Sequence, residues 1–523
     1  MKNIHCYEYL VIGAGPAGLQ TGYYLEKGGH DYLIIDKGQV PGEFFKKYPR
    51  HGKLISINKV HTGFDDPEVN LRFDWNSLLS DNDELLLKHY SKKYFPDSSD
   101  FVQYLKDYAD KTNLKIEHGV HVTKISKNET FEVQSADGKI YHCKYLIMAT
   151  GVSKCYIPDI PNIELAETYD EFSVDPDDYT NQRVLVVGKG NSAFETADNL
   201  VETTSLIHIL SPNSVKMAWN THFVGHLRAV NNNFLDTYQL KSQNALLDAV
   251  IKGIEMVDGK YHVSMSYSHA EGEEEILVYD RVLLCTGFRF DNTIFDDTCL
   301  PELTINDRFP AQTHEWESVN VPDLYFAGTV TQQRDYKKTT SGFIHGFRYN
   351  VKCLYDILKV KNHGQEFKCR EVDLTPENLK DLMIERINRS SALWQQFGFI
   401  CDIVVVSEKE QKAYYYEELP VDYINETHFS KNDHYYLITL EYGENIHMVK
   451  DVFAIDRAHN QDAKSADRSQ FLHPIIRRFS KMEKLSELHI MEHLEANWTC
   501  NHHVEPLLEY LNKQIPQELE NPV

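Results

Sequence analysis

Apolar runs that end at a glycine recur along the chain and predict strands buried in parallel sheets. The first run, residues 9–12, leads into residues 13–18 with the pattern Gly-x-Gly-x-x-Gly, and a helix is expected to follow to about Gly28. A second apolar run, residues 32–35, ends at Asp36. Because continuous apolar runs of this length are typical of strands covered on both faces, the chain begins with the strand, glycine turn, helix and strand of a dinucleotide-binding fold.

The glycines and the acid of this first unit have separate chemical roles. Gly13 permits a tight turn, Gly15 lets the backbone approach a pyrophosphate, and Gly18 lets the helix pack closely on the strand. The start of the helix offers unpaired N–H groups to phosphates, and Asp36 stands where a carboxylate binds the ribose of an adenosine. The candidate binding residues of this unit are Gly13, Gly15, Pro16, Ala17, Gly18, Asp36 and Lys37.

The same order of elements occurs a second time. The apolar run 183–187 leads into a glycine turn in which Ala193 replaces the third glycine, an accepted variant. The next apolar run, residues 206–210, ends at Ser211 and is followed by Lys216. A hydroxyl and a cation there favour a 2′-phosphate, and hence NADPH, as the bound nucleotide. NADH remains an alternative, and Lys216 could equally be a plain surface charge. The candidate residues of this unit are Gly188, Gly190, Asn191, Ser192, Ser211 and Lys216.

Three further apolar runs complete the two units. Residues 145–151 and 281–287 each end in Thr-Gly, and residues 324–328 end in Ala-Gly. We therefore predict an α/β fold class with two Rossmann-like dinucleotide-binding domains, the second inserted into the first. The expected domains are a first fold over residues 1–155 and 286–365, a second fold over residues 156–285, and a C-terminal α+β appendage over residues 366–523.

The C-terminal appendage shows no glycine turn and no motif with chemistry of its own. Its periodicity predicts a helix over residues 376–395 and strands over residues 401–406 and 435–442. Residues 485–511 are expected to be mostly helical, with a break near Trp498.

Composition and charge exclude several classes of partner. Lys and Arg number 54 against 78 Asp and Glu, so the formal net charge is −24, which argues against nucleic-acid binding because that needs clustered cations. No stretch reaches the roughly 18 apolar residues of a membrane span. The first residues show no signal-peptide pattern, and we expect a cytoplasmic protein.

Nine cysteines are scattered through the chain and never form Cys-x-x-Cys. A disulfide framework or a zinc site would show paired spacing. His502 and His503 are adjacent, so their rings point apart, and no cysteine or carboxylate cluster accompanies them. We therefore expect reduced thiols and no metal site.

These motifs together resemble the two-dinucleotide-binding-domain flavoproteins, in which the first fold holds FAD and the second holds NAD(P)H. The resemblance implies that Asp36 binds the adenosine ribose and that backbone near Val122 contacts the adenine. It also implies that the Ala-Gly strand closes the flavin site and that a helix start near Phe343 points at the flavin. The residues added in this way are Val122, Thr150, Gly151, Gly328, Thr329 and Phe343.

Within this group, several stretches are similar to flavin-containing monooxygenases. Residues 42–49, with Phe45, resemble the segment beside the isoalloxazine, and residues 56–59 resemble the segment that carries a catalytic asparagine. The resemblance implies that Asn58 protects a C4a-(hydro)peroxyflavin, and a turn-forming asparagine between strands is its other interpretation. A halogenase is a narrower variant of this chemistry, in which Lys59 beside Asn58 would assist halide oxidation. The disulfide reductases of the same group need a cysteine pair, and neither of their two locations holds one here.

Longer stretches resemble the family of the ER flavoprotein associated with degradation, also called FAD-dependent oxidoreductase domain-containing protein. They cover nearly the whole chain, at residues 49–59, 74–79, 94–97, 190–197, 235–242, 342–349 and 471–474. The resemblance implies flavin chemistry. We do not expect the lumenal role of that family to apply, because the first residues carry no signal peptide and the last four, residues 520–523, form no retention signal.

The sequence thus favours an NAD(P)H-reduced FAD monooxygenase or oxidoreductase that acts on a small molecule with O2. The alternative is a flavoprotein with structural or redox-sensing FAD that binds a protein client through its C-terminal domain, and a homodimer stays open. An aromatic insertion in the second fold, with Trp219, His222 and Tyr238, would shape a substrate pocket with Trp75 if it covers the flavin. A small aromatic core under a long loop is its other interpretation.

Overall fold

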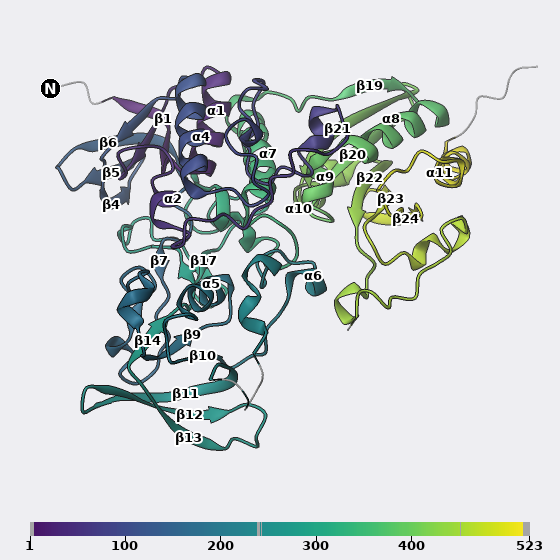
Figure 1. The fold of residues 1–523 in the computed structure, drawn as a ribbon. Coiled ribbons are helices and arrows are strands. Elements are labelled where there is room, and N and C mark those ends of the chain that lie inside the picture. Colours follow the sequence, from purple (N-terminus) through teal and green to yellow (C-terminus); the bar gives the residue numbers. More distant parts are fainter. Residues whose placement is uncertain (1–4, 238–240, 242, 450, 516–523) are drawn as a thin grey trace, which may run out of the picture.

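The structure is a computed structural model that describes residues 5–237, 241, 243–449 and 451–515. Its three large sheets correspond one to each expected part of the chain (Figure 1), and two further sheets have only two strands each. The two dinucleotide folds lie one above the other in that view, and the C-terminal part lies beside the first fold. The predicted fold class, two Rossmann-like folds with an added α+β part, is confirmed.

The first sheet is built from seven strands in the order β3-β2-β1-β6-β5-β4, with β18 paired to β6. Its parallel strands are β1 (Cys6–Ile12), β2 (Tyr32–Asp36), β3 (Ile116–His118), β6 (Ile140–Met148) and β18 (Leu324–Phe326). The strand β5 (Phe131–Ser135) pairs antiparallel with β6, and β4 (Val122–Lys127) pairs antiparallel with β5. Successive residues of β1 face opposite sides, so Tyr9 and Val11 meet the helices while Leu10 and Ile12 meet the β4–β6 side.

The second sheet repeats this layering. Its order is β13-β12-β11-β10-β9-β14-β8, formed by β8 (Glu167–Thr168), β9 (Arg183–Val187), β10 (Leu206–Ser211), β11 (Ala245–Val257), β12 (Lys260–Tyr267), β13 (Glu274–Tyr279) and β14 (Arg281–Leu284). Val184 and Val186 of β9 face the helix side, and Leu185 and Val187 face the β11–β13 side. The chain crosses between the two folds through β7 (Lys154–Cys155) and β15 (Phe288–Arg289), which pair with one another.

The helices of the two folds follow the glycine turns or connect the strands. In the first fold they are α1 (Pro16–Lys27), α2 (Phe44–Lys47), α3 (Pro67–Asn70), α4 (Ser98–Lys111) and α7 (Ile344–His363). In the second they are α5 (Asn191–Leu200) and α6 (Ala218–Thr221). A 3-10 turn, η6 (Gly328–Gln333), follows β18, and a short hairpin of β16 (Leu303–Thr304) and β17 (Phe309–Pro310) precedes it.

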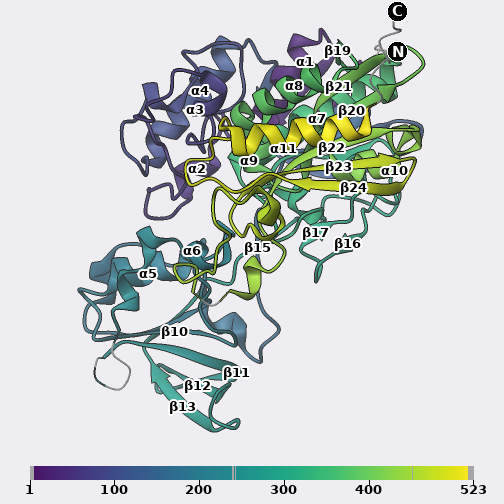
Figure 2. The ribbon, with the colours of Figure 1, turned by 90° about the vertical axis from the view of Figure 1, so that its right-hand side faces the viewer.

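The C-terminal part is a six-stranded antiparallel sheet covered by helices. Its order is β19-β21-β20-β22-β23-β24, from β19 (Arg370–Asp373), β20 (Ile400–Ser407), β21 (Lys412–Pro420), β22 (Tyr435–Glu441), β23 (His473–Ser480) and β24 (Glu483–His489). Its helices are α8 (Pro376–Arg389), α9 (Ser391–Gln395), α10 (Val421–Glu426) and α11 (Asn501–Gln514). Figure 2 shows α11 lying across this part beside α8.

The expectation of a mostly helical segment over residues 485–511 is wrong in its first half. Residues 483–489 form the edge strand β24, paired antiparallel to β23, and the helix begins only at Asn501. Lys484, Leu485 and Glu487 favour a helix by themselves, but pairing with an open sheet edge overrides that local preference.

The core of the C-terminal part is continuous with the helix side of the first fold. One cluster of buried side chains joins Tyr9 of β1 and Leu354 of α7 to Ile438 of β22 and Leu511 of α11. Arg386 of α8 binds Asp402 with its Nε 2.9 Å from the carboxylate and also reaches Glu68 of the first fold at 3.0 Å. The C-terminal part and the first fold therefore share one hydrophobic core. Among the described residues, no helix is long and apolar enough to cross a lipid bilayer.

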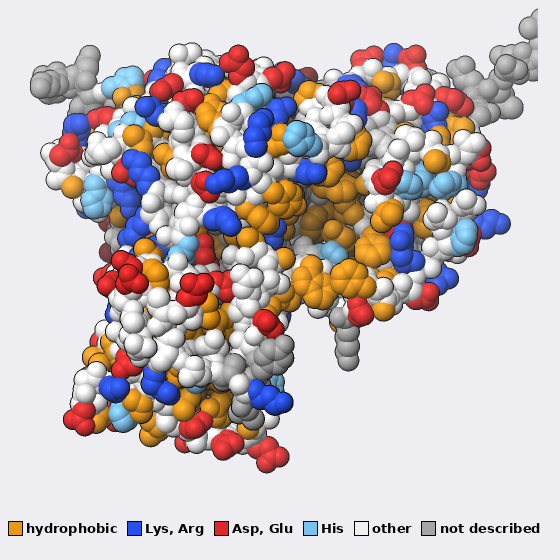
Figure 3. Space-filling model, viewed as in Figure 1, with side chains coloured by type: hydrophobic (Ala, Val, Ile, Leu, Met, Phe, Trp, Pro, Cys, Tyr) orange, Lys and Arg blue, Asp and Glu red, His pale blue; other side chains and the backbone are white. Residues whose placement is uncertain are grey.

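One face of the molecule is hollowed between the C-terminal part and the two dinucleotide folds. Figure 3 shows hydrophobic side chains lining this hollow, with charged groups around it. The exposed ring of Phe453 in the C-terminal part stacks on Trp219 of the second fold, with ring centroids 5.6 Å apart. The C-terminal part thus contacts the second fold as well as the first.

Candidate functional site

A cavity of about 1210 Å³ opens at the carboxyl ends of four parallel strands of the first sheet. Asp36 is the last residue of β2, Gly151 follows β6 and Gly328 follows β18, and all three lie in its wall with Ile12 of β1. This is where ligands bind in open α/β sheets. The volume exceeds the roughly 300 to 1,000 Å³ of pockets for drug-sized ligands, as a dinucleotide requires.

Most of the residues expected to bind the first cofactor line this cavity together. They are Gly13, Gly15, Pro16, Ala17, Asp36, Lys37, Phe45, Val122, Thr150, Gly151, Gly328, Thr329 and Phe343. Gly18 does not line it, because its role is packing. A Cβ on Gly18 would stand 1.7 Å from the carbonyl oxygen of Gly13, so α1 approaches the turn more closely than any side chain allows.

The other glycines also fit a bound dinucleotide. Gly13 has a φ of +111°, and a Cβ there would lie 2.7 Å from the carbonyl oxygen of Ala149. A Cβ on Gly15 would meet no protein atom within 4 Å, so the space beside it is open to a ligand. Gly328 has a φ of +83°, and a Cβ would lie 2.5 Å from that of Ala17. The turn after β18 therefore closes directly onto the start of α1.

The carboxylate of Asp36 is held in place at the end of β2. Its Oδ2 accepts a hydrogen bond of 2.6 Å from the backbone N–H of Ala14, and its Oδ1 accepts one of 2.6 Å from that of Gly38. An ionised carboxylate has about four lone-pair sites. Two sites thus orient the group and the others remain available for ribose hydroxyls.

A row of stacked rings forms the wall near the start of α7. The rings of Trp75 and His345 stack, with centroids 4.3 Å apart and planes 22° apart. The ring of Phe343 stacks on His345 as well, with centroids 5.9 Å apart. Both ring nitrogens of His345 are buried and have no hydrogen-bond partner in the described part of the chain. Burial and the nearby arginines, Arg348 and then Arg228, hold the pKa of His345 well below its usual range. A neutral, unpartnered imidazole in the cavity wall fits a bound ligand that hydrogen-bonds to it.

The guanidinium of Arg228 lies over the ring of Trp75, 5.2 Å from the centroid. Arg228 comes from the insertion of the second fold, and it lines the cavity together with Val224. Burial lowers the pKa of Arg228, and no carboxylate of the described residues forms an ion pair with it. Arg228 thus places a positive charge beside the aromatic wall.

The structure does not bring the two expected catalytic residues to the cavity. Asn58 is buried, and its Nδ2 donates to the backbone carbonyls of Ser91, at 2.9 Å, and Lys93, at 3.2 Å. Both amide hydrogens are therefore engaged in holding that segment. Lys59 is exposed. From the same segment it is Ser56 that lines the cavity, with its hydroxyl donated to Asn76.

The candidate residues of the second fold lie outside this cavity. Gly188 has a φ of +122°, and a Cβ there would lie 2.3 Å from the carbonyl oxygen of Cys285. The carboxamide of Asn191 accepts from the backbone N–H of Arg228 at 2.9 Å and donates to the carbonyl of His226 at 2.9 Å. Asn191 thereby fixes the insertion that carries Arg228 into the cavity. Ser192 lies beside it in the first turn of α5, for which Gly190 is the N-cap.

Beside the end of β10, the carboxylate of Asp248 on the neighbouring strand β11 forms an ion pair with a lysine. The hydroxyl of Ser211 donates to the carbonyl of Asn213 at 3.0 Å. Asp248 stands beside Ser211 in the register of β10 and β11, where it binds Lys189 and accepts from Ser214. These hydrogen bonds lower the pKa of Asp248 to about 2 although burial opposes them. Lys216 is exposed nearby in sequence.

The aromatic residues expected to shape a substrate pocket separate into two places. Trp75 of the first fold lies in the cavity wall. In the insertion of the second fold, Trp219 packs on Phe453, and the ring of His222 lies 4.7 Å from that of Tyr442 in the C-terminal part. Tyr238 lies outside the described residues. Sequence reasoning singled out neither Arg228 nor His345. His345 lies within residues 342–349, one of the stretches that resemble a known family, but no local signal separates it from a buried core residue.

No cysteine of the described chain lines the cavity. All nine are free thiols, and Cys155 and Cys285 are the nearest along the chain to lining residues. Burial raises the pKa of Cys155 to about 11 and that of Cys285 to about 12. Since the thiolate is the nucleophile, both groups are inert at neutral pH.

Comparisons with known proteins place this arrangement among flavoproteins. The family model described as pyridine nucleotide-disulphide oxidoreductase matches residues 10–328. FAD-dependent oxidoreductase domain-containing protein 2 of Mus musculus is 36% identical, with 98% of this chain and 85% of the mouse protein covered. The counterpart of Danio rerio is 35% identical, with 90% and 75% covered.

A solved structure shares the fold at lower identity. The flavin-containing monooxygenase from Stenotrophomonas maltophilia matches with a TM-score of 0.53 and 18% identity, covering 69% of this chain and 100% of that one. Identity at this level speaks for the fold alone, so the chemistry has to be argued from the site.

Proposed function

This chain belongs to the pyridine nucleotide-disulphide oxidoreductase family and to the family of FAD-dependent oxidoreductase domain-containing protein 2, and on that premise we propose a monooxygenase-type enzyme that is reduced by NADPH and acts with O2 on a small-molecule substrate. Membership makes the chain an FAD-dependent oxidoreductase. What we propose is that NADPH donates the electrons and that O2 accepts them.

The observation that carries the proposal is a flavin-sized cavity without a thiol. The residues that fit FAD line one cavity, and no described cysteine stands among them. Relay of electrons to a disulfide needs a thiolate pair beside the flavin, and the nearest thiols, Cys155 and Cys285, have raised pKa values. The remaining route is transfer to a diffusible acceptor.

The residues of the first fold would bind and orient FAD. Asp36 would accept hydrogen bonds from the adenosine ribose, and the backbone at Gly13 and Gly15 with the start of α1 would hold the pyrophosphate. The turn from Gly328 and the start of α7 at Ile344 would approach the flavin ring. When bound, FAD supplies the redox chemistry, taking two electrons from a reduced nicotinamide and passing them to O2.

The wall of Trp75, His345 and Arg228 would shape the substrate side. Aromatic faces exclude water from the reacting atoms. His345 would offer its ring to one polar atom, and Arg228 would bind an anionic group because no carboxylate neutralises it in the described structure. A planar substrate with an anionic group fits this wall best.

Turnover of the purified yellow protein with NADPH tests the proposal. We expect NADPH oxidation that consumes O2, does not reduce DTNB when O2 is removed, and persists in the double variant Cys155→Ser/Cys285→Ser. Reduction of DTNB without O2, lost in that variant, would contradict it. FAD that binds tightly while NADPH is never oxidised would also contradict it and favour a structural flavin with a protein client.

A further inference from the structure

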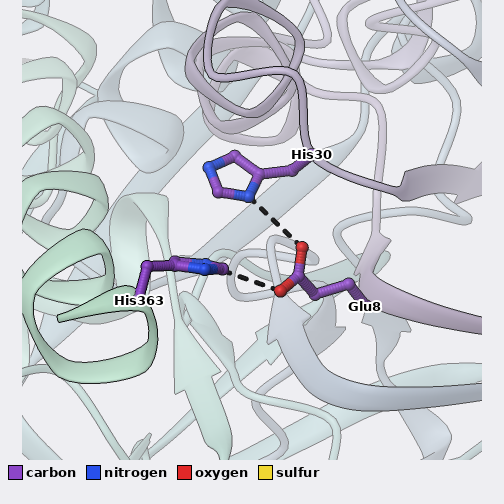
Figure 4. Close-up of side chains that lie close together, drawn as sticks. All are labelled: Glu8, His30 and His363. Carbon is purple, nitrogen blue, oxygen red and sulfur yellow. Dashed lines mark hydrogen bonds and ion pairs between the residues drawn. The ribbon is translucent and has the colours of Figure 1, made fainter. Parts of the chain in front are cut away.

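Two imidazoles and a carboxylate meet at the end of the first fold that lies opposite the cavity (Figure 4). Glu8 belongs to β1, His30 lies in the turn between α1 and β2, and His363 is the last residue of α7. The Nδ1 of His30 is 3.2 Å from Oε2 of Glu8, and the Nε2 of His363 is 3.5 Å from Oε1. Figure 4 shows both rings turned toward the carboxylate.

We propose that Glu8, His30 and His363 form a binding site for a divalent transition metal ion of the zinc class. One ligand atom from each residue lies within 4.8 Å of the others. Ligands at about 2.1 Å from a tetrahedral zinc ion are about 3.4 Å apart. Each imidazole nitrogen lies close to this distance from one oxygen of Glu8, 3.2 Å from Oε2 for His30 and 3.5 Å from Oε1 for His363. Two imidazoles and one carboxylate suit zinc, cobalt or nickel, whereas magnesium and calcium prefer oxygen ligands.

The ring of His30 is held in position by close packing behind it. A Cβ on Gly28 would lie 2.7 Å from the His30 ring and 2.2 Å from the hydroxyl of Tyr355. Gly28 has a φ of −80°, so the glycine is needed for space and not for its backbone angle. The His30 side chain is only 9% exposed. A ligand fixed in this way loses little freedom when a metal binds.

The surroundings favour a cation. The helices α1 and α7 both end at the cluster, at Lys27 and His363, and the carbonyl end of a helix carries partial negative charge. The side chains of Glu8 and His363 are 24% and 23% exposed, which leaves a path for an ion from solvent.

The nitrogen of His363 that faces Glu8 also contacts a tyrosine hydroxyl. The hydroxyl of Tyr9 is 3.1 Å from Nε2 of His363 and accepts a hydrogen bond of 3.2 Å from Nδ2 of Asn362. A metal ion on Nε2 would take the place of the Tyr9 hydroxyl at that nitrogen, and the displaced hydroxyl would be free to donate to the carboxylate of Glu8.

The ion would join three segments that are far apart in the chain. The helix α7 has 20 residues and is therefore about 30 Å long, with its other end in the cavity wall. At that distance the ion would stabilise the first fold without entering the redox chemistry. The proposal is thus independent of the proposed function.

Titration of the chelator-treated, FAD-loaded full chain with Zn²⁺ or Co²⁺ tests the site. We expect one equivalent bound per chain, visible ligand-field bands of four- or five-coordinate Co²⁺, and a Tm rise of about 2 °C or more in excess Zn²⁺. Mg²⁺ should give no such rise. The variants Glu8→Gln, His30→Gln and His363→Gln should each weaken binding by about 100-fold or more, since even residues behind the ligands change affinity by about 10- to 100-fold.

His314→Gln is the matched control, because His314 also pairs with a carboxylate, Glu426 at 3.0 Å, but with no second imidazole in the described structure. It should bind the metal as the unchanged chain does. The proposal is overturned if the unchanged chain binds no Co²⁺ at one equivalent, if its Co²⁺ bands are absent, or if His30→Gln and His363→Gln bind as tightly as His314→Gln. The Co²⁺ spectrum of the unchanged chain keeps the test decisive even where a variant fails to fold.

Discussion

The carbonyl oxygen of Gly13 occupies the space that a side chain on Gly18 would need, 1.7 Å from an added Cβ. Gly15, between them in the same motif, has open space at its Cβ position and a φ of −78° that any residue adopts. The three glycines therefore have different roles. A substitution at Gly18 should affect folding, whereas one at Gly15 should affect cofactor binding.

Gly18→Ala is expected to destabilise the first fold by roughly 3 kcal/mol or more, because α1 must move away from β1. Gly15→Ala should leave the Tm of the FAD-free protein within about 1 °C of the unchanged chain while lowering its FAD content, since the methyl group points at the pyrophosphate. The ratio of flavin to protein absorbance and the Tm after removal of FAD measure the two effects. Full FAD retention by Gly15→Ala would refute the placement of the pyrophosphate.

Arg228→Met is expected to weaken anion binding in the cavity. Benzoate should perturb the spectrum of the bound flavin in the unchanged chain, because a carboxylate pairs with Arg228 while a ring stacks at Trp75. Benzamide has the same shape without the charge. We expect Arg228→Met to raise the benzoate Kd by about tenfold or more and to change that of benzamide by less than about twofold. Equal losses for both ligands would mean that Arg228 acts through packing alone.

Glu195→Gln should raise stability at alkaline pH. Burial, and then the charge of Asp198, raises the pKa of Glu195 from 4.5 to about 7. The folded chain then holds this proton more tightly than the unfolded chain does, so the group costs stability as the pH rises from about 4.5, with the full cost of about 3 kcal/mol reached above pH 7.

The Tm advantage of Glu195→Gln over the unchanged chain should accordingly be small at pH 5 and largest at pH 8. Glu84→Gln, at an exposed position, is the control and should show no such trend. A difference that is constant across this range would contradict the raised pKa.

Lys216→Ala is expected to raise the KM for NADPH by about tenfold, the equivalent of one charge-assisted contact, and to leave that for NADH unchanged. Asp248, beside the end of β10, forms an ion pair with Lys189. Its carboxylate is therefore not free to bind the 2′-hydroxyl of NADH. Steady-state kinetics with both nucleotides measure the ratio. An equal rise for both would mean that Lys216 contacts a part common to them.

The glycine turns and the strand ends could be predicted from sequence because they are local. Gly13, Asp36 and Thr150 each stand at the carboxyl end of a predicted strand, and parallel strands bring such ends together at one sheet edge. Geometry then separates Gly18, which packs, from Gly15, which faces the cavity.

The substrate wall could not be predicted in the same way. Trp75, Arg228 and His345 come from three segments that only the tertiary fold brings together. Asn58 was expected in the site by resemblance, but its amide hydrogens hold the carbonyls of residues 91 and 93. The strand β24 formed where helix-favouring residues met an open sheet edge.

The most direct measurement of the central claim is an anaerobic titration of the FAD-loaded protein with NADPH. A flavin without a redox-active disulfide accepts two electrons, so we predict complete bleaching at one equivalent of NADPH per FAD, no new titratable thiols, and return of the yellow spectrum on mixing with O2. A requirement for two equivalents, with two thiols appearing per chain, would contradict the account.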